Sequence, residues 1–247
     1  MNEPDLVERA GELASIKNAL REAASGDGQF TLVEGPAGVG KSALLAAAAA
    51  RARQLEAEVL SAHAGEFERG LPFEITRQLF VRALVREPER RERVLVHAAA
   101  PAATVLGLAA TDSGLSAPSE AQHALYWLTA NLTAEAPLVL LIDDLQWADP
   151  SSQEWLLYLA RRVAKLPLAV LTTWRTDDPE TTSTVLDGLR DEPCVLRVTP
   201  QPLSPPAVAT VVRSTLSAPV DLAACEAVHR VTAGNPFLVA ELLRELP

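Results

Sequence analysis

Two kinds of apolar pattern alternate along the chain. Short, nearly continuous runs rich in Val, Ile and Leu are typical of strands buried on both faces of a sheet, whereas three- and four-residue spacings are typical of helices. Because helical patterns separate the runs, the strands are expected to be parallel and joined by helical crossovers. The sequence therefore predicts an α/β fold. Its five predicted strands cover residues 29–34, 58–64, 137–144, 167–175 and 194–200.

Helices are predicted in the intervals between these strands. One covers residues 6–24, a second covers the alanine-rich residues 41–57, and a third covers residues 151–166. A mostly helical insert extends from about residue 73 to residue 136 and is interrupted by the loop TDSGLSAPS.

The stretch PQPLSPP, residues 200–206, is interpreted as a hinge. It separates an α/β core, residues 1–200, from residues 201–247, which are interpreted as the start of a helical lid subdomain. A length of 247 residues suits one large domain or one and a half. Three helices are predicted beyond the hinge, at residues 207–216, 223–233 and 236–246.

The stretch VEGPAGVGKSALL, which begins at Val33, carries the strongest chemical signal. It matches G-x-x-x-x-G-K-[ST] between a predicted strand and a predicted helix, so its backbone N–H groups are expected to cradle a phosphate beside the positive end of that helix. Lys41 is expected to reach the β- and γ-phosphates, and Ser42 to offer its hydroxyl to Mg²⁺. The predicted phosphate-binding residues are Gly35, Pro36, Ala37, Gly38, Val39, Gly40, Lys41, Ser42 and Ala43.

Charged residues end the third and fourth predicted strands. Asp143 and Asp144 belong to the same sheet edge as the glycine-rich loop, where Asp143 can hold Mg²⁺ through water and Asp144 can orient or deprotonate a water. The alternative is a polar strand end that makes a turn. Arg175 either contacts a γ-phosphate or is a solvent-exposed arginine, and the sequence leaves both open.

Two Asx-Pro pairs mark expected helix starts. Asp149 before Pro150 and Asn235 before Pro236 fit an N-cap followed by proline at the first helical position. A capping box from Ser151 to Glu154 offers a competing start for the helix at residues 151–166.

Composition excludes several classes of protein. A net charge of −10 opposes direct DNA binding, which depends on Lys and Arg. No apolar run approaches the roughly 18 residues of a membrane span, and the polar N-terminus is unlike a secretory signal, so a cytoplasmic protein that does not bind membranes is expected. Cysteines and histidines lack metal-ligand spacing: Cys194 and Cys225 are expected to be buried free thiols, and His63, His97, His123 and His229 non-catalytic.

Six segments together resemble a known family. They are LVERAGELA, GPAGVGKSALL, LVLLIDDLQWADPSS, LTTWR, QPLSPPAVATVV and TAGNPFLVAELL. In this order they are similar to the nucleotide-binding module of large ATP-binding regulators of the LuxR family. These regulators are signal-transduction ATPases with numerous domains, related to AAA+ ATPases. The resemblance runs over nearly the whole chain.

The resemblance implies a P-loop fold with strand order 5-1-4-3-2 and assigns roles to single residues. Asp143 then serves Mg²⁺, Asp144 is the catalytic acid, and Arg175 is the sensor. Pro236 packs on the adenine. Val7 and Arg9 are base-side contacts in LVERAGEL, a segment in which Glu8 stands where the family has glycine and Ala10 where it has glutamate.

The function implied is a switch that binds ATP or ADP with Mg²⁺ and hydrolyses ATP slowly. Its expected partners are other domains of a parent protein, with possible homo-oligomerisation on ATP binding. The family's winged-helix, repeat and helix-turn-helix domains are not in this sequence, so a module of a longer regulator is expected. A metabolic P-loop kinase and a replication-initiator-type AAA+ ATPase are the alternatives.

Overall fold

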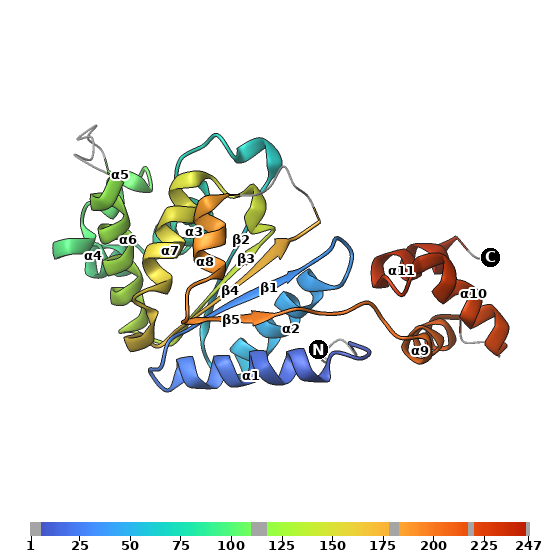
Figure 1. Cartoon of the computed structure of the whole chain (residues 1–247). Coiled ribbons are helices and arrows are strands. Elements are labelled where there is room, and N and C mark those ends of the chain that lie inside the picture. Colours follow the sequence, from blue (N-terminus) through green and yellow to red (C-terminus); the bar gives the residue numbers. More distant parts are fainter. Residues whose placement is uncertain (1–5, 110–117, 178–182, 217–219, 246–247) are drawn as a thin grey trace.

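The computed structural model describes residues 6–109, 118–177, 183–216 and 220–245. Its centre is a sheet of five parallel strands in the order β2-β3-β4-β1-β5 (Figure 1). The predicted fold and strand order are therefore confirmed. The strands are β1 (Gln29–Gly35), β2 (Glu58–His63), β3 (Leu138–Asp143), β4 (Leu168–Arg175) and β5 (Val195–Val198).

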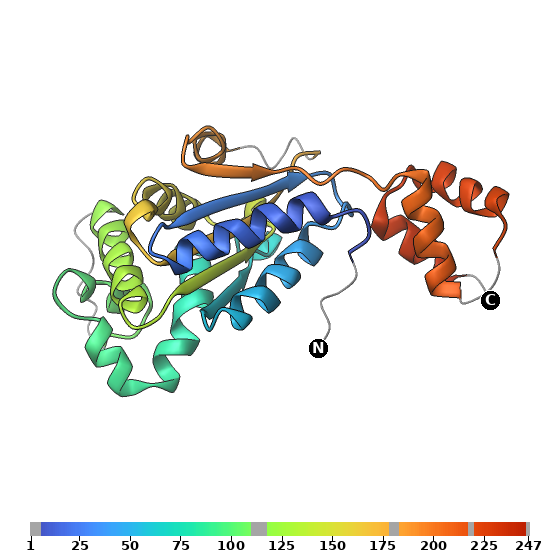
Figure 2. The same ribbon diagram turned by 90° about the horizontal axis from the view of Figure 1, so that it is seen from below.

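Helices cover both faces of the sheet, because alternate residues of each strand point to opposite faces. On one face, Val33 and Leu141 pack with residues of α1 (Ala10–Ala24) and α2 (Lys41–Gln54). Figure 2 shows α1 lying along this face. On the other face, Leu32 packs in a larger cluster that includes residues of α7 (Pro150–Ala160) and α8 (Thr184–Arg190).

The segment between β2 and β3, where the helical insert was predicted, contains four α-helices in its described residues and completes the larger cluster. Residues 110–117, which hold most of the loop TDSGLSAPS, lie outside the described residues, and its last two residues begin a helix. An ion-pair network fixes the insert to the sheet, since Arg90 pairs with Glu58 at 2.5 Å and with Glu135 at 2.7 Å. The helices of the insert are α3 (Glu74–Arg86), α4 (Pro88–Val94), α5 (Ala102–Val105) and α6 (Pro118–Thr133).

The ends of two predicted helices were wrong because left-handed residues interrupt them. Glu8 has a φ of 59°, so the first helix starts at Ala10 and leaves residues 6–9 outside it. Glu56 has a φ of 57°, and the second helix stops at Gln54. Glycine is favoured in this region of backbone space, and other residues occupy it at a cost.

The third predicted helix also differs. The Asp149 side chain accepts from the Ser152 N–H at 2.9 Å, so the cap is Asp149 and the Ser151 capping box is wrong. The helix ends at Ala160, and a 3₁₀ turn at Val163–Lys165 follows. The short helix α8 was not predicted.

Three C-terminal helices lie beyond the carboxyl ends of the strands (Figure 1). They are α9 (Pro205–Leu216), α10 (Leu222–Thr232) and α11 (Pro236–Arg244), and they surround a small apolar core of their own that includes Val208, Val239 and the buried Cys225. We call α9 to α11 the lid. Within the described part of the chain, no helix has the length and apolar character needed to cross a bilayer.

Candidate functional site

The loop between β1 and α2 turns back over the start of its helix. Gly38 and Gly40 have φ values of 75° and 101°, which glycine adopts without strain. A Cβ at Gly38 would lie 2.6 Å from Asn235 Oδ1, so glycine also permits the lid to approach. Because α2 begins at Lys41, directly after the loop, its unpaired N–H groups face the same space.

The ammonium group of Lys41 is held by its own loop. Its Nζ donates to the carbonyls of Gly35 and Pro36, each at 2.7 Å, and the residue is buried. Burial lowers the pKa of Lys41 below its ordinary value, and repulsion by Arg175 adds to this. Three carboxylates oppose the shift, those of Asp144, Asp177 and Asp143.

Thr173 of β4 fixes the acidic pair at the end of β3. Its hydroxyl donates to Asp143 Oδ1 at 2.5 Å and accepts from the Asp144 N–H at 2.8 Å. Asp144 itself lies just past the strand, in the left-handed region with a φ of 56°. The second oxygen of Asp143 and the hydroxyl of Ser42 are hard donors of the kind that Mg²⁺ prefers, so these predicted ligands suit that ion.

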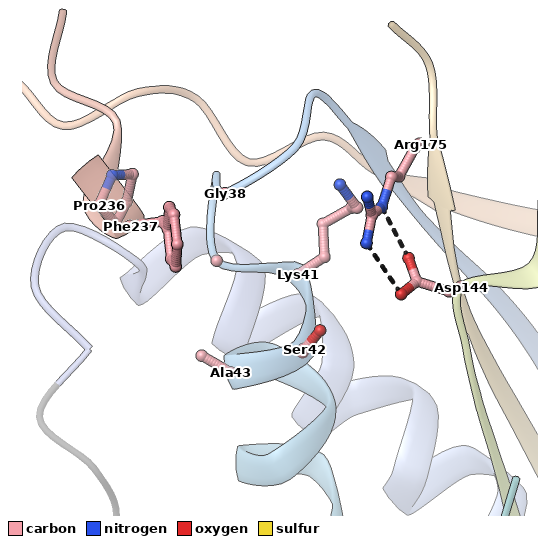
Figure 3. Close-up of a pocket in the computed structure, with 9 residues that line it drawn as sticks. Gly38, Lys41, Ser42, Ala43, Asp144, Arg175, Pro236 and Phe237 are labelled. Atoms are coloured by element: carbon pink, nitrogen blue, oxygen red, sulfur yellow. Dashed lines mark hydrogen bonds and ion pairs between the residues drawn. The ribbon is translucent and has the colours of Figure 1, made fainter. Parts of the chain in front are cut away.

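Arg175 is paired with the predicted catalytic acid. Its Nε donates to Asp144 Oδ1 at 2.9 Å and its Nη2 to Oδ2 at 3.1 Å, which is a two-pronged bond (Figure 3). Burial alone would raise the pKa of Asp144, but the bonds from Arg175 and Gln146 outweigh it and hold that pKa below its usual value. In return, the carboxylate raises the pKa of Arg175.

Gln146 is a site residue that the sequence reasoning missed. Its side chain is fully buried, donates to Asp144 Oδ1 at 2.8 Å and accepts from the Arg175 N–H at 3.0 Å. It therefore joins the ends of β3 and β4. The signal available was a single amide in the otherwise apolar and acidic stretch IDDLQW.

His63 also lies at this edge. It ends β2 beside Asp143, and the ligand atoms of His63, Asp143 and Asp144 lie within 4.8 Å of one another. The sequence reasoning set all four histidines aside because none has a neighbouring partner in sequence. Only the strand order brings this one to the carboxylates.

Two adjoining cavities border the loop. The first, about 280 Å³, has Lys41, Asp144 and Arg175 at one side of the loop and Pro236 and Phe237 at the other (Figure 3). The second, about 180 Å³, is largely apolar and contains the predicted base-side residues Val7 and Arg9. The first is lined by Gly38, Gly40, Lys41, Ser42, Ala43, Asp144, Arg175, Pro236 and Phe237; the second by Leu6, Val7, Arg9, Val39, Gly40, Ala43, Leu203, Val211 and Pro236.

Arg9 directs its guanidinium to the backbone. The group is buried and donates to the carbonyls of Val39 at 3.1 Å and Gln201 at 2.6 Å. Next to it, the Glu8 carboxylate accepts from the Ser204 N–H at 2.7 Å. These bonds tie the segment before α1 to the glycine-rich loop and to residues 200–206, the predicted hinge.

The lid is bonded directly to the phosphate-binding loop. Asn235 Nδ2 donates to the Ala37 carbonyl at 2.9 Å, and the Phe237 N–H donates to the Gly38 carbonyl at 3.2 Å. Asn235 also caps α11, since its Oδ1 accepts from the Phe237 N–H. The predicted cap is thus confirmed, and the bond to the loop is an addition to it.

The two cysteines lie apart from this site. Cys225 is buried in the lid, as predicted, but the prediction was wrong for Cys194, which is exposed and bonded to the Ala160 carbonyl. It directly precedes the short edge strand β5, where packing covers less of each side chain.

Comparisons with known proteins agree with this fold. An uncharacterized protein of Rhizobium meliloti (strain 1021) is 26% identical in an alignment of 216 residues that covers 78% of this chain and 20% of that protein. The Aeropyrum pernix Orc1 protein, solved in complex with DNA, is similar with a TM-score of 0.57 and 20% identity, over 98% of this chain and 60% of that one.

A signal transduction ATPase with numerous domains from Pyrococcus horikoshii, which has a tetratricopeptide repeat sensor, is similar with a TM-score of 0.54 and 19% identity, over 98% of this chain and 30% of that one. This chain therefore spans 20% of the bacterial relative's length and 30–60% of these two structures. The model of the AAA ATPase domain family matches residues 5–171, more than half of the sequence. The chain belongs to the AAA ATPase domain family.

Proposed function

We propose that this chain is the ATP-binding, slowly hydrolysing switch module of a multidomain, signal-responsive transcriptional regulator of the LuxR type. The observation that carries the proposal is the two-pronged bond between Arg175 and Asp144 beside the phosphate-binding loop. It joins the residue proposed to read the terminal phosphate to the residue proposed to activate water.

In this proposal the nucleotide lies along both cavities. The base occupies the apolar one, against Val7 and Pro236, and the phosphates follow the loop toward Lys41 and Arg175. Apolar walls suit the faces of a base, and backbone N–H groups and cations suit phosphates. Mg²⁺, when bound, would neutralise charge on the phosphates, and Ser42 and Asp143 are the residues proposed to hold it.

Slow turnover follows from the state of Asp144. A general base needs a free oxygen and a pKa near the working pH, whereas both oxygens of Asp144 accept bonds and its pKa is lowered. Activation of water therefore requires Arg175 to leave the carboxylate. A terminal phosphate offers the guanidinium an alternative two-pronged partner.

The contacts of the lid provide the output of the proposed switch. Asn235 and Phe237 bind carbonyls of the same loop whose N–H groups would hold phosphate. A change in the loop on binding or hydrolysis would therefore alter the position of the lid, and other domains of a longer protein would sense it.

The fold likeness to Orc1 keeps a replication-initiator role as the second candidate. Its main difficulty is the net charge of −10. A metabolic kinase would need a second substrate for the phosphoryl group.

One experiment separates the three. The purified chain is incubated with Mg-ATP alone, then with an added phosphoryl acceptor and then with DNA. Nucleotide binding, ADP formation and DNA binding are measured. The switch predicts slow ADP formation without an acceptor and no salt-sensitive DNA binding. Submicromolar binding to one DNA sequence would favour the initiator, and ADP formation only with an added acceptor would favour the kinase. Absence of any nucleotide binding would overturn the proposal.

A further inference from the structure

A third carboxylate lies directly against the phosphate-binding loop. Asp177 Oδ2 accepts from the Ala37 N–H at 3.1 Å, and the Thr176 N–H donates to the Gly35 carbonyl at 3.4 Å. These bonds continue the pairing of β1 with β4, in which Gly35 lies opposite Arg175. The sheet register therefore places Asp177, two residues past the strand, on the loop.

The same carboxylate lies close to both cations of the site. Its charge raises the pKa of Lys41 and the pKa of Arg175, although stronger influences act on each. The local charge is therefore two cations against three carboxylates, a formal excess of one negative charge. The groups counted are Lys41, Arg175, Asp143, Asp144 and Asp177.

The positions of the two cavities indicate which phosphate of a bound nucleotide would lie nearest to this excess negative charge. They share Gly40, Ala43 and Pro236, so the phosphates nearest the base would lie over the start of α2. Lys41 and Arg175 are on the side away from Pro236 (Figure 3). A chain of phosphates that starts at the base thus brings its last member toward the group of charges that includes Asp177, while ADP ends one phosphate earlier.

We infer that Asp177 is a specificity-determining residue that weakens the binding of ATP relative to ADP. This inference rests on the proposed nucleotide binding. The carboxylate occupies the Ala37 N–H, and it repels the charge of a third phosphate, whereas the phosphates that ADP retains would lie nearer the start of α2 and farther from this carboxylate. ATP binding then requires the segment after β4 to release Asp177 from the loop.

The test is calorimetric titration of ADP and of a non-hydrolysable ATP analogue, each with Mg²⁺, into the wild type and Asp177→Asn. Asparagine keeps an oxygen for the Ala37 N–H and removes the charge. The ATP analogue should bind about tenfold more tightly, equivalent to about 1.4 kcal/mol. ADP affinity should change by less than about twofold, because its phosphates lie farther from the substituted group.

Asp27→Asn is the matched control, since it makes the same charge change at an exposed residue just before β1. This residue lies at the amino ends of the strands, whereas the site lies at their carboxyl ends. Asp177→Ala also frees the Ala37 N–H, so it should tighten the ATP analogue at least as much as Asp177→Asn does. An unchanged ratio of the two affinities in a protein that binds both nucleotides would overturn this inference alone. Failure of the wild type to bind either nucleotide would instead overturn the proposed function.

Discussion

The two cavities beside the phosphate-binding loop differ in how their polar groups are satisfied. In the apolar cavity, the single charged group, on Arg9, is committed to backbone carbonyls and stiffens the walls. Lys41 and Arg175 line the other cavity, where Lys41 donates to loop carbonyls and Arg175 donates to Asp144. Asp177 lies beside the loop and accepts from the Ala37 N–H. In the proposed function, these groups exchange partners when a phosphate binds. In the proposed binding mode, the apolar cavity is the base end of the site and supplies affinity common to ATP and ADP, and the other cavity is the phosphate end and supplies the difference between them.

This difference has a physical origin. Burying a flat apolar surface in a preformed cavity needs little rearrangement, and its free energy does not depend on the number of phosphates. Charged groups in a half-buried site cannot be left without partners, so each is paired within the protein until a ligand replaces that partner. A ligand changes such an arrangement only by its differential affinity for the two states.

The largest expected effect is that of Lys41→Ala. The substitution removes the ammonium group that is expected to contact the β- and γ-phosphates. Loss of a charge-assisted bond of about 2.7 kcal/mol corresponds to a loss of about a hundredfold in affinity. Because ADP retains the β-phosphate, both nucleotides should be weakened. Calorimetry or the thermal shift with Mg-nucleotide measures this.

Lys165→Ala is the control for this change, because Lys165 is exposed in the 3₁₀ turn before β4, at the far end from Arg175. It should leave the affinity unchanged. An equal thermal shift in Lys41→Ala and wild type would show that the phosphate is not bound at this loop.

The next effect is on turnover. Asp144→Asn should slow ADP formation at least about tenfold, the usual size of a general-base contribution. It should also tighten a non-hydrolysable ATP analogue several-fold, because Arg175 loses the partner that competes with phosphate. Turnover is measured by ADP release under saturating Mg-ATP. If the variant and the wild type turn over equally, Asp144 has no part in the reaction.

These residues also show what the sequence could predict. The loop at residues 35–43, the acids at the end of β3 and the capping asparagine are each encoded within a short segment, so local pattern was enough to single them out. Gln146 has only the weak local signal of an amide in IDDLQW, and His63 and Asp177 have none. These three residues join the site because β2, β3, β4 and β1 lie in that order in the sheet. This order brings together pairs of residues that are separated in the sequence by 29 to 140 positions.

Two further misses have different causes. The helix α8 has seven residues, about two turns, which is too short for an apolar period to become distinct. The pairing of Arg175 with Asp144 could not be predicted because Arg175 has an alternative partner in phosphate and Asp144 in water, and the choice depends on side-chain geometry at the sheet edge.

Arg175→Ala tests the discrimination between ATP and ADP at the third phosphate alone. A donor that reaches only the third phosphate should matter only to ATP, so the analogue should weaken about tenfold and ADP should be nearly unaffected. In the Asp144→Asn background the loss should be larger, because the guanidinium is no longer shared with the carboxylate. Calorimetric titration of both nucleotides into the four proteins gives the coupling. A parallel fall in both affinities would assign Arg175 to support of the fold.

The smallest effect concerns Glu8, at the base end. Glu8→Gly and Glu8→Ala both remove the carboxylate that accepts from the Ser204 N–H, so the difference between them isolates the cost of the left-handed backbone. After allowance for the greater chain entropy of unfolded glycine, Glu8→Gly should be the more stable by about 0.5–1 kcal/mol, or about 1–3 °C in Tm. The ratio of ATP-analogue to ADP affinity should stay within about twofold of wild type in both variants, because Glu8 adjoins the base cavity and is remote from the phosphate charges. Equal stability of the two variants would mean that residue 8 relaxes out of the left-handed region once the carboxylate is gone. A change in this ratio would mean that the base end contributes to the discrimination between ATP and ADP. The assignment of that discrimination to the phosphate end alone would then be wrong.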